Sequence, residues 1–283
     1  KAGRPVSGTG GRKAARGLVL YAMVLTIGVG MAAPFLWMLS SSFKPMSEIF
    51  AYPPTVLPQE PTLENYLNAF SQAPVLRWLL NSAIVSGTII LANLFTSSMA
   101  AYAFARIEFP GRDVVFYVLI ATLMIPFHLT LVPLFLVLKT LGLVNSLAGV
   151  IAPGLASVLG VFLLRGFFRA IPVELEEAAR VDGASELQLY WRIAMPLAQP
   201  ALATLGIITL VHSWGEFLLP LLVLNSPSQY TLPLGLATFQ NEYATQWGQI
   251  MAVTTVADIP ILVLFVALQR HFIEGLTQGA VKG

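Results

Sequence analysis

The sequence predicts an all-α integral membrane protein, and three observations support this prediction. Hydrophobic residues make up 56% of the 283 residues and charged residues only 11%, a balance typical of membrane proteins. The apolar residues form continuous runs of about 20, the length that a helix needs to cross a bilayer. These runs lack the short, alternating pattern of membrane barrel strands, so helices are favoured over a β-barrel.

Six apolar runs are long enough to cross a membrane. We expect one six-helix domain, residues 17–283, with spans at about 17–39, 81–104, 114–138, 147–168, 199–224 and 250–269. Residues 1–16 hold five basic side chains among small residues and are expected to form a flexible cytoplasmic tail. The first run is long and has no small-residue cleavage site after a short core, so we expect no removable signal peptide.

The distribution of basic residues predicts the orientation. With the N-terminus inside and six alternating spans, 13 of the 16 Lys and Arg residues fall on the inner side. Only Lys44, Arg77 and Lys139 fall outside. Because Lys and Arg concentrate on the cytoplasmic side of membrane proteins, we expect both termini and the segment 170–198 to face the cytoplasm.

Segment 170–198, here called the polar loop, lies between the fourth and fifth spans. Its stretch 174–196 carries seven charged residues. Pro172 suits the first turn of a helix, Gly183 suits a left-handed stop, and Ser185 with Gln188 matches a capping box. We therefore expect two short helices joined at Gly183. They share apolar residues that a groove on a soluble partner can cover: Leu175, Ala178, Ala179, Val181 and Leu187.

Several common chemistries are excluded or have no motif here. The sequence contains no G-x-x-x-x-G-K-[ST] phosphate loop, no H-E-x-x-H and no G-x-S-x-G motif. It contains no cysteine, which excludes disulfides and thiolate metal sites. We therefore expect no enzyme, no bound cofactor and no metal on this chain. If transport uses ATP, the energy must enter from another chain.

Within the polar loop, Glu177-Ala178-Ala179, Gly183 and the later Ile193-Ala-Met195-Pro196 resemble the EAA signature of permease subunits of bacterial ABC importers. That signature usually has Leu at the position of Met195, a replacement that conserves volume and apolarity. The resemblance implies a coupling helix that docks on a cytoplasmic ATPase. It implies coupling roles for a set of residues: Glu177, Ala178, Ala179, Asp182, Gly183, Ile193 and Pro196.

Four further motifs resemble the carbohydrate branch of these importers. They are 43–45 (FKP), 101–103 (AYA) with 109–111 (FPG), 214–217 (WGEF) and the C-terminal 275–283. Together they resemble the six-helix permease subunit of maltose-transporter-like systems in the bacterial plasma membrane. The resemblance implies a second homologous permease, two ATPase subunits that bind ATP and Mg, and an extracytoplasmic sugar-binding protein. It implies no nucleic acid partner.

Two outer loops are candidates for contact with the binding protein. The proline-rich loop, residues 42–79, contains Thr62, which is expected to cap a short helix over 63–70. The aromatic loop, residues 225–249, combines amides and aromatic rings that suit a sugar. The alternative is that both loops only cover helix ends. The candidate contacts in the aromatic loop are Phe239, Gln240, Asn241 and Tyr243.

Four polar or aromatic residues inside spans are candidates for the translocation path: His128, Trp214, Glu216 and Asp258. An ionisable residue inside a membrane is costly and by default indicates function. Each also has a structural alternative. Glu216 can cap a helix end, His128 can bond a neighbouring helix near Pro126 and Pro133, and Trp214 can anchor the membrane interface.

Two other functions stay open at this point. An ion- or proton-coupled secondary transporter would use Asp258, His128 and Glu216, and would work without an ATPase. A non-transporting scaffold would use the polar loop only to recruit a soluble partner. No inverted repeat is evident in the sequence, which disfavours the secondary transporter.

Overall fold

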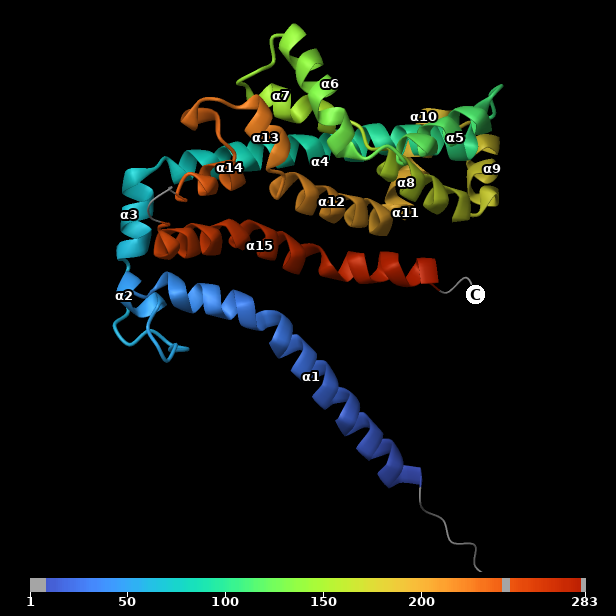
Figure 1. Ribbon diagram of the computed structural model, residues 1–283. Helices are drawn as coiled ribbons and strands as arrows, with labels where there is room; N and C mark the ends of the chain where they lie inside the picture. The colour runs from blue at the N-terminus through green and yellow to red at the C-terminus, as the bar shows by residue number, and fades with distance from the viewer. Residues whose placement is uncertain (1–8, 241–244, 281–283) are drawn as a thin grey trace, which may run out of the picture. The chain divides into compact units, whose positions relative to one another are not determined.

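The computed structural model describes residues 9–240 and 245–280, and these residues form helices and turns with no β-strand among them (Figure 1). The expected all-α fold is therefore confirmed. The chain divides into two compact units, which are described separately. The first comprises residues 1–69 and 245–255, and the second comprises residues 70–244 and 256–283.

The first unit contains α1 (Thr9–Ser42), α2 (Met46–Ile49), most of α3 (Glu64–Gln72) and the start of α15 (Trp247–Ala280). Thr62 accepts a hydrogen bond from the Glu64 amide at 3.1 Å, which confirms the expected cap. Lys44 is buried, its ammonium donates to the Thr55 carbonyl, and it lies 4.6 Å from the centre of the Trp37 ring. The lysine of the FKP motif therefore holds the proline-rich loop against the end of α1.

The second unit contains the remaining helices. In chain order they are α4 (Val75–Arg106), α5 (Arg112–Thr122), α6 (Phe127–Thr140), α7 (Leu147–Ile151), η1 (Ala152–Gly154), α8 (Val158–Ala170), α9 (Val173–Val181), α10 (Glu186–Leu189), the π-helix η2 (Tyr190–Ala194), α11 (Met195–Leu197), α12 (Gln199–Trp214), α13 (Leu218–Val223), η3 (Pro227–Gln229) and α14 (Leu232–Ala237).

Helix α4 is the centre of the second unit and packs mainly against α8 and α12. Their contact buries an apolar cluster that includes Ala101, Leu164, Phe168 and Leu205. A polar contact joins α4 to η1, since Asn93 of α4 donates to the Gly154 carbonyl at 2.6 Å. In a bilayer the hydrophobic effect does not drive helices together, because lipid is as apolar as their side chains. Close packing of small residues and interhelical hydrogen bonds hold the helices together instead.

The candidate spans differ in shape from the six expected ones. Four helical stretches are each long and apolar enough to cross a membrane: 17–42, 75–106, 147–170 and 247–267. Two bent pairs qualify only when each is counted as one span. Residues 112–122 and 127–140 meet at 98°, and residues 186–197 and 199–214 meet at 76°. The described residues therefore give four spans, or up to six with the bent pairs.

The bends lie at identifiable residues. In the third apolar run, α5 ends at Thr122 and α6 begins at Phe127, with Pro126 between them. Proline disfavours helical backbone in the residue that precedes it, which accounts for the break. Pro133 lies inside α6 and does not end it. The second bend lies at residue 198, between α11 and α12. A separate break divides the expected fifth span, because α12 ends at Trp214 and α13 begins at Leu218, so the expected single helix over 199–224 is two helices.

Candidate functional site

The polar loop has the local structure that its sequence predicts. α9 ends in a Schellman motif, in which the Gly183 amide donates to the Arg180 carbonyl at 3.0 Å and the Ala184 amide to the Ala179 carbonyl at 2.9 Å. Gly183 has φ +84°, the left-handed conformation that favours glycine. Ser185 and Gln188 form the expected capping box at the start of α10. Two short helices joined at Gly183 are thus confirmed.

One side of the polar loop packs on its own unit. Glu176 is fully buried, and its Oε1 atom lies 2.8 Å from Nε of Arg106, the last residue of α4. The same guanidinium donates to the Ile171 carbonyl at 2.6 Å, just before α9. Buried charges need a partner and hydrogen bonds. Arg106 supplies both to Oε1, whereas the buried Oε2 atom makes no hydrogen bond among the described residues. No local pattern in the sequence identifies Arg106 as the partner of Glu176, because 70 residues separate them.

Arg180 joins the two helices of the polar loop. Its Nε and Nη2 atoms donate to the two carboxylate oxygens of Glu186, at 2.9 and 3.3 Å. The Glu186 carboxylate raises the pKa of Arg180 above its ordinary value through this hydrogen bond. Arg180 Nη2 also lies 3.7 Å from the second oxygen of Glu176. The Arg180–Glu186 pair therefore spans the turn between α9 and α10, whereas the Arg180–Glu176 contact lies within α9.

The opposite side of the polar loop is uncovered. Leu175, Val181 and Leu187 are 48%, 88% and 62% exposed, and Glu177 and Ala178 are exposed beside them. Apolar side chains grouped on a charged loop are costly in water unless a partner covers them. We call these five residues the docking face. All five were expected as apolar or coupling positions, and they are exposed whereas Glu176, which pairs with Arg106, is buried.

The other expected coupling residues vary in exposure. Asp182, Gly183 and Pro196 are exposed, whereas Ala179 and Ile193 are half-buried. Behind them, η2 and α11 rest on the core through fully buried residues. These are Leu189, Ala194 and Ala198.

The four path candidates do not form one cluster. Glu216 lies just beyond α12, and its Oε1 accepts from the Leu219 amide at 3.1 Å, so it caps α13. Trp214 is 7% exposed and donates to the Ala257 carbonyl at 3.2 Å. His128 is exposed at the start of α6, and Asp258 is half-buried on α15. The position of Trp214 favours a packing role, and that of Glu216 combines a cap with partial exposure.

A hollow of about 590 Å³ follows one face of α12 and includes Glu216. Its other lining residues include Ile208, Val211 and His212. His212 precedes Glu216 by one helical turn, and it was not among the expected path residues. Its position four residues before an acid was the available signal, because residues at this spacing share a helix face.

The described part of the aromatic loop is held by α4. Trp78 donates through Nε1 to the Pro227 carbonyl at 2.8 Å, and Asn81 donates to the Tyr230 carbonyl at 2.8 Å. Of the expected binding-protein contacts, Phe239 is buried with its ring centre 6.1 Å from that of Trp78, and Gln240 is exposed. Asn241 and Tyr243 lie outside the described residues.

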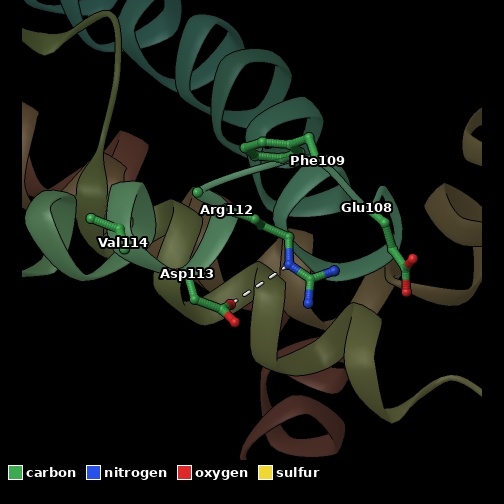
Figure 2. A pocket seen from close by; sticks show the side chains of 6 residues that line it. Glu108, Phe109, Arg112, Asp113 and Val114 are labelled. Carbon is green, nitrogen blue, oxygen red and sulfur yellow. Dashed lines mark ion pairs between the residues drawn. The ribbon is translucent and has the colours of Figure 1, made fainter.

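The turn between α4 and α5 contains the FPG motif and a shallow hollow of about 300 Å³ (Figure 2). Gly111 has φ +79° and begins α5. Figure 2 shows Arg112 directed toward Asp113, with Nε and Oδ1 at 3.6 Å. Arg165 of α8 also pairs with Asp113 at 3.2 Å. These contacts fix the turn beside α8.

No group of three His, Asp or Glu side chains within the described residues is arranged to hold a metal ion. The described residues instead form a helical membrane protein in which a buried ion pair holds the polar loop and the docking face is uncovered. Such a loop suits a protein partner rather than a chemical reaction.

Comparison with known proteins identifies the family. A sequence model described as the binding-protein-dependent transport system inner membrane component matches residues 93–278. The arabinooligosaccharides transport system permease protein AraQ of Halalkalibacterium halodurans is 38% identical over 268 residues, which cover 92% of this chain and 96% of that protein. The diacetylchitobiose uptake system permease protein NgcG of Streptomyces coelicolor is 33% identical, with 93% and 88% covered.

A solved structure has the same fold. One chain of a bacterial ABC transporter involved in import of the acidic polysaccharide alginate matches with a TM-score of 0.81 at 22% identity, covering 95% of this chain and 100% of that chain.

The class that fold and loop define is a transport permease rather than a catalytic enzyme. This chain belongs to the family of binding-protein-dependent transport system inner membrane components. The resemblance to permeases of carbohydrate importers that the motifs carry is thereby confirmed.

Proposed function

We propose that this chain is one permease subunit of an ATP-driven importer and that it carries a sugar or sugar derivative by alternating access. The observation that carries the proposal is the docking face, an uncovered apolar surface on a loop whose other side is fixed by a buried ion pair. A surface of this kind transmits force only when a partner covers it.

The cargo class rests on the relatives. Arabinooligosaccharides, sulfoquinovosyl glycerol and diacetylchitobiose are named for permeases that are 38%, 36% and 33% identical to this chain. All three are sugars or sugar derivatives. They differ in size and charge, so they support a carbohydrate class and not one compound.

The expected partners follow from the family. Two ATPase subunits that bind ATP and Mg would sit beneath the polar loop, and a second homologous permease would complete the membrane domain. An extracytoplasmic sugar-binding protein would deliver the cargo, as in the alginate transporter solved with its pentasaccharide-bound periplasmic protein. The distribution of Lys and Arg supports an orientation with both termini in the cytoplasm.

In the proposed cycle, ATP binding closes the two ATPases and moves the docking face. Glu177 is the polar anchor in the ATPase groove, Ala178 and Ala179 allow close approach, and Gly183 sets the angle between α9 and α10. The helices of the membrane domain then rearrange, and the path opens toward the binding protein. Hydrolysis and product release reset the cycle.

Two further groups of residues belong to this proposal. Glu216, His128 and Asp258 remain candidates for the translocation path, since polar groups in a membrane domain are tolerated where they meet water or one another. Gln240 and the neighbouring part of the aromatic loop remain candidates for contact with the binding protein.

The test is purification followed by reconstitution. We expect this chain to copurify with a second permease and an ATPase, and we expect a sugar-loaded binding protein to stimulate ATP hydrolysis by the complex in lipid vesicles. Sugar uptake by this chain alone, driven by an ion gradient and insensitive to ATP, would contradict the proposal and favour a secondary transporter.

A further inference from the structure

We propose that Arg106 and Glu176 are a positioning pair that fixes the polar loop to α4, and that α4 links this loop mechanically to the aromatic loop. The inference rests on the proposed function, because it concerns how ATPase docking and binding-protein docking communicate. It assigns roles to residues that the coupling signature does not include.

At one end, α4 is attached to three parts of the polar loop. Arg106 bonds the Glu176 carboxylate of α9 and the Ile171 carbonyl that precedes α9. One turn earlier, Tyr102 donates to Glu186 of α10 at 3.3 Å. Ser98 and Tyr190 of η2 share a buried hydrogen bond of 2.7 Å. Because these contacts lie on successive turns of one helix, the polar loop cannot move without either carrying α4 or breaking them.

The Arg106–Glu176 pair is the buried ion pair among these attachments. The two side chains are 10% and 0% exposed, so water cannot readily replace the bond. The guanidinium uses separate nitrogens for the carboxylate and the backbone carbonyl, a geometry that a lysine ammonium does not reproduce. Glu177, the next residue, is exposed on the docking face. The two adjacent glutamates therefore have different partners, one inside this chain and one outside.

At its other end, α4 holds the aromatic loop. The Trp78 indole and the Asn81 amide donate to backbone carbonyls of residues 227, 228 and 230. Ser82 accepts from the Leu232 amide at 2.8 Å. Gly235 of α14 lies so close to Trp78 that an added Cβ would stand 2.2 Å from the indole ring. In Figure 1, α14 lies beside one end of α4, and α9 and α10 lie beside the other.

The helix between these ends is continuous. α4 has 32 residues and no proline, so its length is about 48 Å at a rise of 1.5 Å per residue. The hydrocarbon core of a bilayer is only about 30 Å thick. The outermost contacts, at Trp78 and Arg106, are about 42 Å apart along the helix and can therefore both lie outside it. The bent pairs 112–140 and 186–214 lack this property, since each contains a bend of more than 70°. Sharp helix kinks occur mainly at proline, at Gly/Ser pairs or at π-bulges; α4 has no proline, and it continues as one helix through its Ser86-Gly87 pair.

The first experiment uses the full complex of both permeases, the ATPases and the binding protein in lipid nanodiscs. The variants are Glu176→Gln, Arg106→Lys and the exchanged pair Arg106→Glu with Glu176→Arg. Glu174→Gln is the matched control, because Glu174 is an exposed acid on the same helix. We expect the single variants to assemble and keep basal ATP hydrolysis while stimulation by the loaded binding protein falls about tenfold, within the usual range of allosteric coupling. The exchanged pair is expected to restore part of the stimulation.

The second experiment tests the link along α4. Asn81→Ala is combined with Glu176→Gln. The two residues are 95 positions apart in sequence; Asn81 lies near the start of α4, and Glu176 of α9 contacts Arg106 at its end. We expect the double variant to lose no more stimulation than the more severe single variant, because both changes interrupt one connection. Independent losses that multiply would overturn the link along α4.

The outcomes separate the two proposals. If the unaltered complex does not hydrolyse ATP in response to the loaded binding protein, the proposed function itself is wrong. If the unaltered complex responds and Glu176→Gln responds as strongly as Glu174→Gln, only the positioning pair is wrong. If Glu176→Gln does not assemble, Arg106→Lys decides, because it keeps the charge and removes the second hydrogen bond; a normal response in that variant would overturn the pair.

Discussion

Ser97 on α4 and Gly160 on α8 approach so closely that a Cβ atom at position 160 would stand 2.7 Å from the Ser97 hydroxyl oxygen. Ser97 donates to the Ser157 carbonyl at 3.2 Å, at the residue that caps α8. The backbone of α8 at Gly160 therefore packs directly against the Ser97 side chain of α4, a close approach that small residues allow between membrane helices. Gly166, on the same helix, has no neighbouring atom within 4 Å of such a Cβ.

We expect Gly160→Ala to destabilise the protein by roughly 1–3 kcal/mol, the usual cost of overpacking a well-filled contact. Gly166→Ala is the control and is expected to be neutral or slightly stabilising, because alanine favours helix and meets open space. Thermal unfolding of the two variants in the same detergent measures the difference. Equal melting temperatures for Gly160→Ala and Gly166→Ala would contradict this prediction, because they would mean that the α4–α8 contact accommodates the extra methyl group without loss of stability.

Gly183→Val is expected to uncouple transport from ATP hydrolysis without preventing membrane insertion. Position 183 has φ +84° and no atom within 4 Å of an added Cβ, so the only penalty is backbone strain. That strain is about 1–2 kcal/mol for most residues, and asparagine tolerates the conformation better. We expect more ATP to be hydrolysed per sugar transported by the valine variant, and a milder effect in Gly183→Asn. A normal transport rate in Gly183→Val would remove the angle of the polar loop from the mechanism.

Asn145 is expected to fix the turn before α7 to the aromatic loop. It has φ +59°, its Oδ1 accepts from the amides of Asn225 and Ser226 at 3.0 Å each, and its Nδ2 donates to the Ser226 hydroxyl at 2.8 Å. Asn145→Ala loses these bonds and keeps the strained backbone, so we expect a loss of roughly 2 kcal/mol.

Two matched variants separate the causes. Asn145→Gly relieves the backbone but restores no hydrogen bond, and Asn145→Asp keeps both amide bonds. We expect the stability of the aspartate variant to lie closest to that of the unaltered protein. Limited proteolysis of the loop at 223–226 measures this order. If the glycine variant alone is fully protected, the side-chain bonds contribute nothing.

Glu48 gives the proline-rich loop a dependence on pH. The Thr55 hydroxyl donates to its carboxylate at 2.7 Å and, with the Gln59 and Glu60 amides, lowers the pKa of Glu48 below 4.5. Because the pKa of Glu48 is lower in the folded state than in the unfolded chain, its carboxylate stabilises the loop at pH values above the ordinary pKa of a glutamate. This contribution is lost as the pH falls through the folded-state pKa.

Hydrogen exchange over residues 46–60 tests this dependence. We expect protection to fall below pH 4.5 in the unaltered protein. In Glu48→Gln, protection is expected to be lower at neutral pH and to change little with acid. An identical acid profile in both proteins would place the titrating group elsewhere.

The candidate site was partly predictable from the sequence. Gly183, Ser185 and Gln188 act within a few residues of chain, so their turn and cap follow from local chemistry alone. The division between Glu176 and Glu177 was not predictable, because both are acids at the start of one helix. Only the packing of α9 against Arg106, 70 residues earlier, decides which of them is buried.

The sequence by itself determined that the chain is a helical membrane protein, where its polar loop lies and which family it resembles. These properties depend on composition, on runs of one residue class and on short motifs, all of which are local. The structure decided where the third apolar run bends and where the fifth breaks, and it decided between the alternatives open for Glu216, which caps α13. The tertiary structure decided that Trp214 packs on α15, 43 residues later in the chain. It also decided that both ends of α4 hold loops. The α4 contacts depend on which distant segments meet, because they join residues 70 and 149 positions apart in the chain and leave no local pattern in the sequence.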